Sequence, residues 1–221
     1  MTDAEREQFN REGYVIVEDV LPQPLFEQCK QTLLQMAADE VAKGTSPAYG
    51  SDRGHGFPPT VTAACFSQAN DLQLSPLTKL LTTPKILPKV IDIMGTNTTC
   101  YHFHCNVTPG QGGSALSEGD DSDGGAPDHP DFDSLPCFGF HQDSGLQADC
   151  EYRPAPRFSM KAGYFFTDVS NPGMANTWIV PGKHLDADLV RPNNGERGQP
   201  EGAIPVCCKA NSALLFDRRL W

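Results

Sequence analysis

The sequence predicts a mainly β fold with a helical N-terminal part. Helical patterns occupy residues 1–95, whereas short runs of β-branched and aromatic residues, separated by turn residues, occupy residues 96–221. Helices followed by several short strands favour a β-sandwich or jelly roll with a helical layer. A chain of 221 residues suits one large domain. We therefore expect a single domain, with a helical part at 1–95 and a jelly-roll core at 96–221.

The first helix is predicted from its ends. Thr2 followed three residues later by Glu5 is a capping box, in which each residue satisfies a backbone N–H of the other. The helix should run to about Arg11, because Gly13 is a typical C-terminal stop. The β-branched run YVIVEDV at 14–20 then predicts a strand.

Helices are also expected in the rest of the N-terminal part. Apolar residues near helical spacing predict a helix from Pro24 to about Lys43, which Gly44 ends. Residues 45–60 are rich in Gly, Pro and Ser and should form a loop. Two short helices are expected near Leu77–Leu81 and Pro84–Met94.

Five segments after Gly95 have the composition of strands. They are TTCYHFHCNV (98–107), CFGFHQD (137–143), RFSMKAGYFFTDV (157–169), ANTWIVPG (175–182) and SALLFDRRL (212–220). Residues 110–133 are rich in glycine and aspartate and contain few apolar residues, so we expect a flexible acidic insertion there. An active-site lid and a calcium loop are the alternatives, although the full calcium-loop spacing is absent.

Composition excludes several kinds of partner. The formal net charge is −11, which argues against nucleic acid and against an anionic membrane surface. No run of 18 apolar residues and no signal peptide is evident, since the N-terminus is polar. The eight cysteines have irregular spacings, so reduced thiols in the cytoplasm are the better interpretation.

The stretch FGFHQDSG places His141 and Asp143 two residues apart. Side chains at positions i and i+2 of a strand project from one face, so an imidazole and a carboxylate could bind one metal ion there. Two histidines and one carboxylate form the facial triad of non-heme Fe(II) oxygenases, which leaves three positions open. As the alternative, a histidine and an aspartate at this spacing are often simply a solvated pair on the surface, with no metal.

The chain resembles the phytanoyl-CoA dioxygenase family over most of its length. The resemblance lies in REGYVIVEDVLP (11–22), FGFHQDSG (138–145), PRFSMKAGYFFTDVSNPGMANTWIVPGKH (156–184) and ALLFDRRLW (213–221). It implies a double-stranded β-helix, the other name of this jelly roll. It also implies that Fe(II), 2-oxoglutarate and O₂ are used to hydroxylate a small organic substrate.

The resemblance also implies roles for particular residues. His141 and Asp143 match the first two iron ligands, and the presence of Asp143 favours hydroxylation over halogenation. Asn106 lies in NVTPG, which is similar to a motif of the ectoine hydroxylase branch, where the Asn helps to hold 2-oxoglutarate. Phe138 and Tyr164 match positions that line the co-substrate pocket, with core packing as the alternative for both.

Three further histidines have other expected roles. His102 and His104 form another i, i+2 pair, but no carboxylate accompanies them. They are expected to line a pocket or to be hydrogen-bonded in the core. His184 follows a Pro-Gly turn and is expected to be structural.

The sequence departs from the family pattern at its end. The family's second metal His follows a stretch like DRRLW, and an Arg about one strand later binds 2-oxoglutarate. Here Trp221 is the last residue, and Arg218 and Arg219 come too early for that Arg. We expect a fragment that is inactive alone. The alternatives are a degenerate jelly-roll binding module without catalysis and a hydrolytic Zn(II) protein.

Overall fold

The computed structural model describes residues 1–42, 61–64, 76–100, 103–107, 156–186 and 201–221. The chain forms two compact units. The first unit comprises Met1–Val20, Pro84–Thr98 and Asp128–Trp221, and the second comprises Leu21–Thr83 and Thr99–Pro127. Each unit is described by itself.

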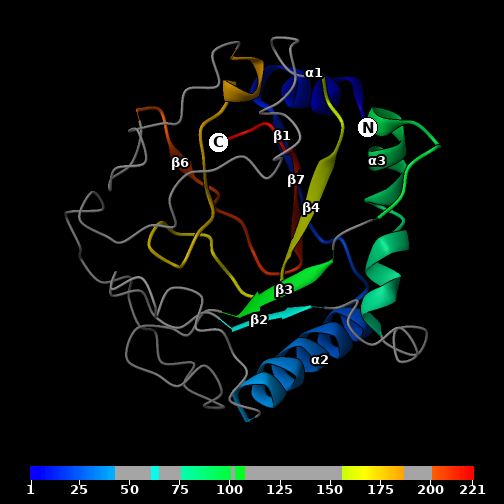
Figure 1. Cartoon of the computed structure of the whole chain (residues 1–221), viewed down its shortest axis with the longest axis vertical. Helices are drawn as coiled ribbons and strands as arrows, with labels where there is room; N and C mark the ends of the chain where they lie inside the picture. Colours follow the sequence, from blue (N-terminus) through cyan, green and yellow to red (C-terminus); the bar gives the residue numbers. More distant parts are fainter. Residues whose placement is uncertain (43–60, 65–75, 101–102, 108–155, 187–200) are drawn as a thin grey trace. The chain divides into compact units, whose positions relative to one another are not determined.

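An antiparallel sheet with the strand order β1-β7-β4 is the centre of the first unit (Figure 1). Its strands are β1 (Tyr14–Val17), β4 (Met160–Phe165) and β7 (Ser212–Asp217). Since β7 lies between the other two strands, nearly all of its residues are buried. The apolar run ALLF therefore occupies the middle of the sheet, where both of its faces can be covered.

The register of the strands decides which residues share a face of this sheet. Phe216 pairs with Tyr14 and with Lys161, whereas Leu215 pairs with Val15 and with Ala162. Because paired residues project to the same side and side chains alternate along a strand, the sheet has two distinct faces. We call the face of Phe216 the inner face and the face of Leu215 the outer face.

A hydrophobic cluster packs on the inner face. The buried members are Val169, Ile179, Val206, Cys208, Leu214 and Leu220, and Tyr14, Ile16, Phe165 and Phe216 pack against them. Of these residues, Ile179 lies in a second, two-stranded antiparallel sheet of β5 (Trp178–Ile179) and β6 (Ile204–Pro205), and Val206 directly follows β6. The described part of this unit is therefore two antiparallel sheets around an apolar core, extended by a bridge between Val169 and Cys208.

Two helices of the first unit are tied to each other by ion pairs. Helix α1 (Asp3–Glu12) has the capping box of Thr2 and Glu5, with Glu5 N–H donating to the Thr2 hydroxyl at 3.2 Å. Helix α3 (Leu87–Met94) supplies Lys89, which donates to the Glu5 carboxylate at 2.6 Å, and Asp92, which accepts from Arg6. These contacts link the N-terminus to a helix more than 80 residues later.

The second unit is built on helix α2 (Gln23–Ala42). Its buried residues Phe26, Cys29, Leu33 and Ala37 are spaced by three and four, so they form one stripe. The helix packs against the 3₁₀ helix η2 (Pro76–Thr82) and against an antiparallel pair of strands. This pair consists of β2 (Val61–Ala64) and β3 (His104–Val107).

Many of the predicted elements are present, with shorter bounds. Helix α1 and its stop at Gly13 are confirmed, and α2 matches its prediction within one residue. The predicted strand 14–20 ends at Val17, and Asp19 has a positive φ of 50° that no strand accommodates. The predicted helix from Pro84 begins at Leu87. The predicted loop 45–60, insertion 110–133 and strand 137–143 lie outside the described residues.

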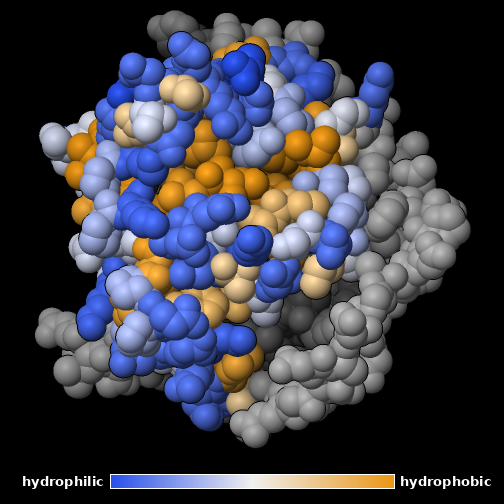
Figure 2. All heavy atoms as spheres, turned by 180° about the vertical axis from the view of Figure 1, so that it is seen from behind, coloured by the Kyte–Doolittle hydropathy of each residue, from blue (hydrophilic) through white to orange (hydrophobic). Residues whose placement is uncertain are grey.

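The surface of the described residues has apolar side chains between hydrophilic ones (Figure 2). The large exposed ones are Leu34, Leu81, Phe158, Met174, Leu185 and Ile204. Among the described helices, none is both long enough and apolar enough to span a membrane.

We predict that Gly13→Ala destabilises the protein more than Gly202→Ala. Both glycines have a positive φ, of 86° and 78°. An alanine at either position is therefore strained, which lowers the free energy of unfolding by about 1–2 kcal/mol. A Cβ at Gly13 would also lie 2.6 Å from His184 Nδ1, whereas no described atom is within 4 Å of a Cβ at Gly202. Denaturant unfolding measures both variants, and equal losses would contradict the close contact with His184.

Candidate functional site

The predicted metal ligands are not among the residues that the structure describes. His141, Asp143 and Phe138 all lie within residues 108–155, so their roles stay predictions. Among the described residues, no group of three or more His, Cys, Asp or Glu side chains could hold a metal ion. A complete metal centre built from other parts of the described chain is therefore not found.

Asn106 and Tyr164, the other two predicted cofactor contacts, lie in different units. Asn106 is exposed on β3, where it pairs with Thr62. Tyr164 is half-buried on β4 and pairs with Ala213. Its register places Tyr164 on the outer face of the sheet, together with Val17. The predicted contacts of both residues with 2-oxoglutarate stay predictions.

The other histidines are placed as follows. His102 lies outside the described residues, and His104 is the first residue of β3. His184 is buried at 1% exposure, and its Nε2 lies 3.1 Å from the Asn10 carbonyl oxygen at the end of α1. Burial lowers the pKa of His184, against the opposing effects of Asp217 and the Asn10 carbonyl. A neutral ring that donates from Nε2 to Asn10 fits the structural role predicted for this residue.

The buried carboxylate at the end of β7 connects several chain segments of the first unit. Asp217 is fully buried, and its two oxygens accept hydrogen bonds from Arg157 Nε at 2.7 Å and Arg219 Nε at 2.8 Å. The backbone N–H of Arg219 donates to the same carboxylate at 3.0 Å. Arg157 in turn lies over the ring of Phe9 on α1. The carboxylate thus holds two separate chain segments, and through Arg157 it is connected to α1.

The protonation state of Asp217 follows from these bonds. Burial alone would raise the pKa of this carboxyl, because a charge in a low-dielectric interior is poorly solvated. The hydrogen bonds from Arg219 and Arg157 outweigh that effect, and the pKa of Asp217 lies below its ordinary value. Asp217 is therefore ionised at neutral pH and compensates the charge of the buried Arg219.

The same carboxylate shapes a turn that carries the chain from one sheet to the other. The Leu220 N–H donates to the Asp217 carbonyl at 2.9 Å, which closes a turn directly after β7. Trp221 then accepts from the Val180 N–H at 2.7 Å, beside β5 of the second sheet. Residues 217–220 therefore link the three-stranded sheet to the two-stranded one, as in a β-sandwich whose strands switch sheets.

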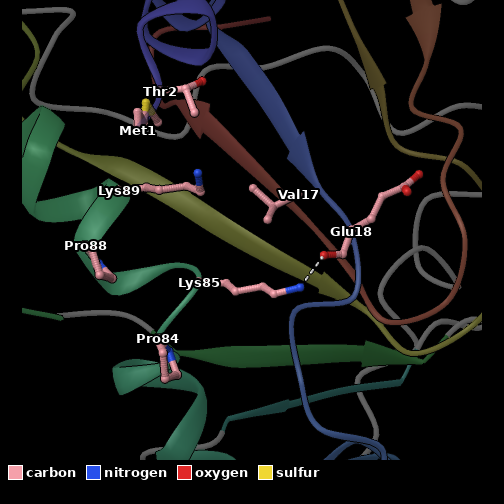
Figure 3. Close-up of a pocket in the computed structure, with 8 residues that line it drawn as sticks. All are labelled: Met1, Thr2, Val17, Glu18, Pro84, Lys85, Pro88 and Lys89. Atoms are coloured by element: carbon pink, nitrogen blue, oxygen red, sulfur yellow. Dashed lines mark hydrogen bonds between the residues drawn. The ribbon is translucent and has the colours of Figure 1, made fainter.

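A hollow of about 410 Å³ lies between β1 and α3 in the first unit (Figure 3). Lys85 and Lys89 extend from α3 and the residues before it, and Lys85 Nζ donates to the Glu18 carbonyl at 3.4 Å. Lys89 is engaged by Glu5. Among the described residues that line the hollow, Glu18 is the only acidic one and none is a histidine, so these residues do not supply the ligand set of the predicted iron chemistry.

Comparison with solved structures identifies proteins with a similar fold. The chain is similar to the non-heme alpha ketoglutarate dependent epimerase SnoN from nogalamycin biosynthesis, with 21% identity and a TM-score of 0.58. It is also similar to SnoN in complex with Fe³⁺, alpha ketoglutarate and nogalamycin RO, with 19% identity and a TM-score of 0.56. Each alignment covers 99% of this chain and 74% of the other. At this identity the likeness shows a shared fold.

No protein-family model matches the chain, and no curated protein matches it either. The resemblance to the phytanoyl-CoA dioxygenase family is therefore not supported at the level of that family. What the chain shares with SnoN is the fold.

Sequence reasoning missed the role of Asp217, although a signal was present. An acidic residue follows the apolar run ALLF without a break and precedes two arginines. A carboxylate that continues a central strand is expected to be buried and paired, since an unpaired one would be too costly.

We predict that Asp217→Asn destabilises the protein by on the order of 3–5 kcal/mol at neutral pH, because it leaves the buried Arg219 without its counter-charge. Asp168→Asn is the matched control, since that exposed carboxylate accepts only from Ser170 among the described residues, and it should cost much less. Denaturant unfolding of both variants measures the difference.

The acid dependence of stability gives a second readout of Asp217→Asn. A lowered folded pKa gives Asp217 a stabilising contribution that is complete above its unfolded value of about 3.9 and is lost as pH falls through the folded value. The variant should therefore lose less stability below about pH 4 than the wild type. The lowered pKa of His184 gives both proteins a loss below about pH 6.5. Identical profiles below about pH 4 would contradict the assignment.

Proposed function

We propose that this protein is a non-heme Fe(II)- and 2-oxoglutarate-dependent dioxygenase that hydroxylates a small organic substrate. The observation that carries the proposal is the HQD stretch at 141–143 in a chain that shares its fold with an alpha ketoglutarate dependent enzyme. A solved structure of that enzyme contains Fe³⁺ and alpha ketoglutarate. Bound Fe(II) and 2-oxoglutarate would supply the oxidising power to cleave a C–H bond with O₂.

The donor set of the proposed centre fits iron. His141 and Asp143 offer an imidazole nitrogen and a carboxylate oxygen, which together suit Fe(II) and leave positions for a co-substrate. In this proposal Asn106 and Phe138 contact 2-oxoglutarate, whereas the outer-face position of Tyr164 favours its alternative role in packing. The antiparallel sheets and the turn at residues 217–220 support closure into a jelly roll, with the metal held in its interior.

Epimerisation is the second candidate reaction, because SnoN is an epimerase. Hydroxylation adds one oxygen atom to the substrate, whereas epimerisation leaves its composition unchanged. The product mass therefore separates the two. The phytanoyl-CoA dioxygenase family is a finer assignment within the same chemistry, and it is supported by the segments at 11–22, 138–145, 156–184 and 213–221.

The substrate in this proposal is a small molecule, which the presence of nogalamycin RO in the SnoN complex supports. The net charge of −11 supports a function that does not involve nucleic acid or an anionic membrane. Cysteines held as thiols support a cytoplasmic location. Cys29 and Cys208 are buried thiols, and burial raises the pKa of each to about 11.

We predict that His141→Ala abolishes Fe(II) binding by the intact protein, because the variant removes one of the proposed iron ligands. His129→Ala is the matched control, since His129 lies in the acidic insertion and has no proposed ligand role. Anaerobic calorimetry with Fe(II) measures binding, and succinate formed under air measures turnover. Equal losses in both variants would contradict the assignment of His141.

A further inference from the structure

The loop after β5 is attached to the C-terminal end of helix α1. This loop contains the short 3₁₀ helix η4 (Lys183–Leu185), which lies beside that end of α1 (Figure 1). The Gly182 N–H donates to the Glu12 carbonyl at 2.9 Å, and His184 Nε2 donates to the Asn10 carbonyl at 3.1 Å. Both acceptors belong to the last turn of α1, whose carbonyls find no partner within the helix. The loop therefore caps α1 from outside.

The ring of His184 is hydrogen-bonded through only one of its two nitrogens. Because the Asn10 carbonyl can only accept, Nε2 carries the proton of the neutral ring and Nδ1 has a lone pair. Nδ1 is buried and has no hydrogen-bond partner in the described structure. It faces Gly13 and Leu220, since a Cβ on Gly13 would lie 2.6 Å from Nδ1 and 3.0 Å from Leu220 Cδ1. An unprotonated Nδ1 fits these apolar surroundings.

A second proton on His184 does not fit the same surroundings. It would turn Nδ1 into a donor that faces apolar atoms, and a buried donor without an acceptor is destabilising. The ring would also carry a charge in the interior, where it is poorly solvated. Both penalties disappear when the loop moves away from α1 and the ring meets water. Acid therefore favours a detached loop over an attached one.

The charged groups that face the ring come from the end of β7 and from the segment before β4. Burial has the largest effect and lowers the pKa of His184. Arg219 and Arg157 act in the same direction, whereas Asp217 and the Asn10 carbonyl oppose it. Asp217 is itself engaged by both arginines, which limits its attraction for a protonated ring.

The charged groups on the two joined elements pair within their own element. On the loop, Lys183 donates to Asp186 at 2.8 Å, and on α1, Arg11 donates to Glu12 at 2.6 Å. Neither of these pairs connects the loop to the helix. Among the described residues, the attachment of the loop to α1 therefore relies on the bonds from Gly182 and His184.

We propose that His184 is an acid-sensitive latch, whose neutral ring holds the η4 loop on α1 and whose protonation releases that loop. The release is local, because β1, β4 and β7 are held by their own strand pairing. Asp217 stays ionised at mildly acidic pH, since its pKa lies below its ordinary value. The latch does not depend on the proposed iron chemistry.

The size of the effect follows from proton linkage. The pKa of His184 is lowered in the attached loop, whereas in the released loop it should be near the unperturbed value of about 6.5. The attachment is therefore complete above about pH 6.5 and weakens as the pH falls toward the lower value. Release takes up one proton, so the population of released loop should rise about tenfold per pH unit in that interval.

The test is amide hydrogen exchange of the intact protein, followed by NMR between about pH 7.5 and about pH 5 and corrected for the intrinsic exchange rate. We expect the protection of the Gly182 amide to fall about tenfold per pH unit below about pH 6.5. The amides of Leu214 and Leu215, which lie in the central strand β7, should stay protected.

His184→Gln separates the hydrogen bond from the titration. Its side-chain amide can donate to the Asn10 carbonyl but takes up no proton, so the variant should stay protected at Gly182 without pH dependence. His129→Gln is the matched control, because it makes the same substitution at a histidine of the acidic insertion, and it should behave as the wild type does. Nitrogen-15 NMR of the wild-type His184 ring gives a readout that needs no variant.

The ring spectra should show a proton on Nε2 at neutral pH and a midpoint below about pH 6.5. A midpoint at or above that value, or a His184→Gln variant with the pH dependence of the wild type, would overturn the proposal. Loss of protection in β7 together with Gly182 would overturn it too, because it indicates global unfolding. None of these measurements requires a metal, so a failure of the iron assignment leaves the latch testable.

Discussion

The buried carboxylate of Asp217 is the interaction on which the described fold depends most. It accepts from Arg157 and Arg219, which lie 60 and two residues away in the sequence. An ionised group in the interior is stable only when its charge and lone pairs are satisfied. Because both arginines satisfy it, the end of β7, the segment before β4 and the turn to the second sheet are fixed at one point.

The ion pair of Asp217 also bears on which side chains lie on each face of the sheet. With Asp217 directed to the outer face, the next residue, Arg218, is directed toward Ser159 and the inner face. Arg157 brings α1 to the outer face through Phe9 and Asn10. His184 bonds to the carbonyl of the same Asn10 and closely approaches Gly13. The ion pair therefore lies on the face that α1 approaches, opposite the face that carries the hydrophobic cluster.

Sequence patterns predicted the elements whose signals are local. The Thr2–Glu5 capping box and Gly13 define α1 because caps act through adjacent backbone groups. The strands β2 and β6 were missed, since four residues and two residues are too short for an alternating pattern. The pairing of Asp217 with Arg157 was not predictable, because a contact across 60 residues leaves no local signal.

The candidate site was predictable to a smaller extent. The spacing of His141 and Asp143 predicts a metal pair, but only pairing between strands decides which face a side chain occupies. Tyr164 illustrates this, since its register with Ala213 places it on the outer face. Lys161, three residues earlier, lies on the inner face. A sequence motif cannot distinguish these two positions, because strand parity depends on the partner strand.

The most direct test of the iron and 2-oxoglutarate assignment is an anaerobic optical titration of the intact protein. Fe(II) and 2-oxoglutarate added together should produce a weak visible metal-to-ligand charge-transfer band, and neither should do so alone. This result requires the metal and the keto acid to meet at one centre. Tight binding of Zn(II), with no band when Fe(II) and 2-oxoglutarate are combined, would contradict the account and indicate a hydrolytic metal site.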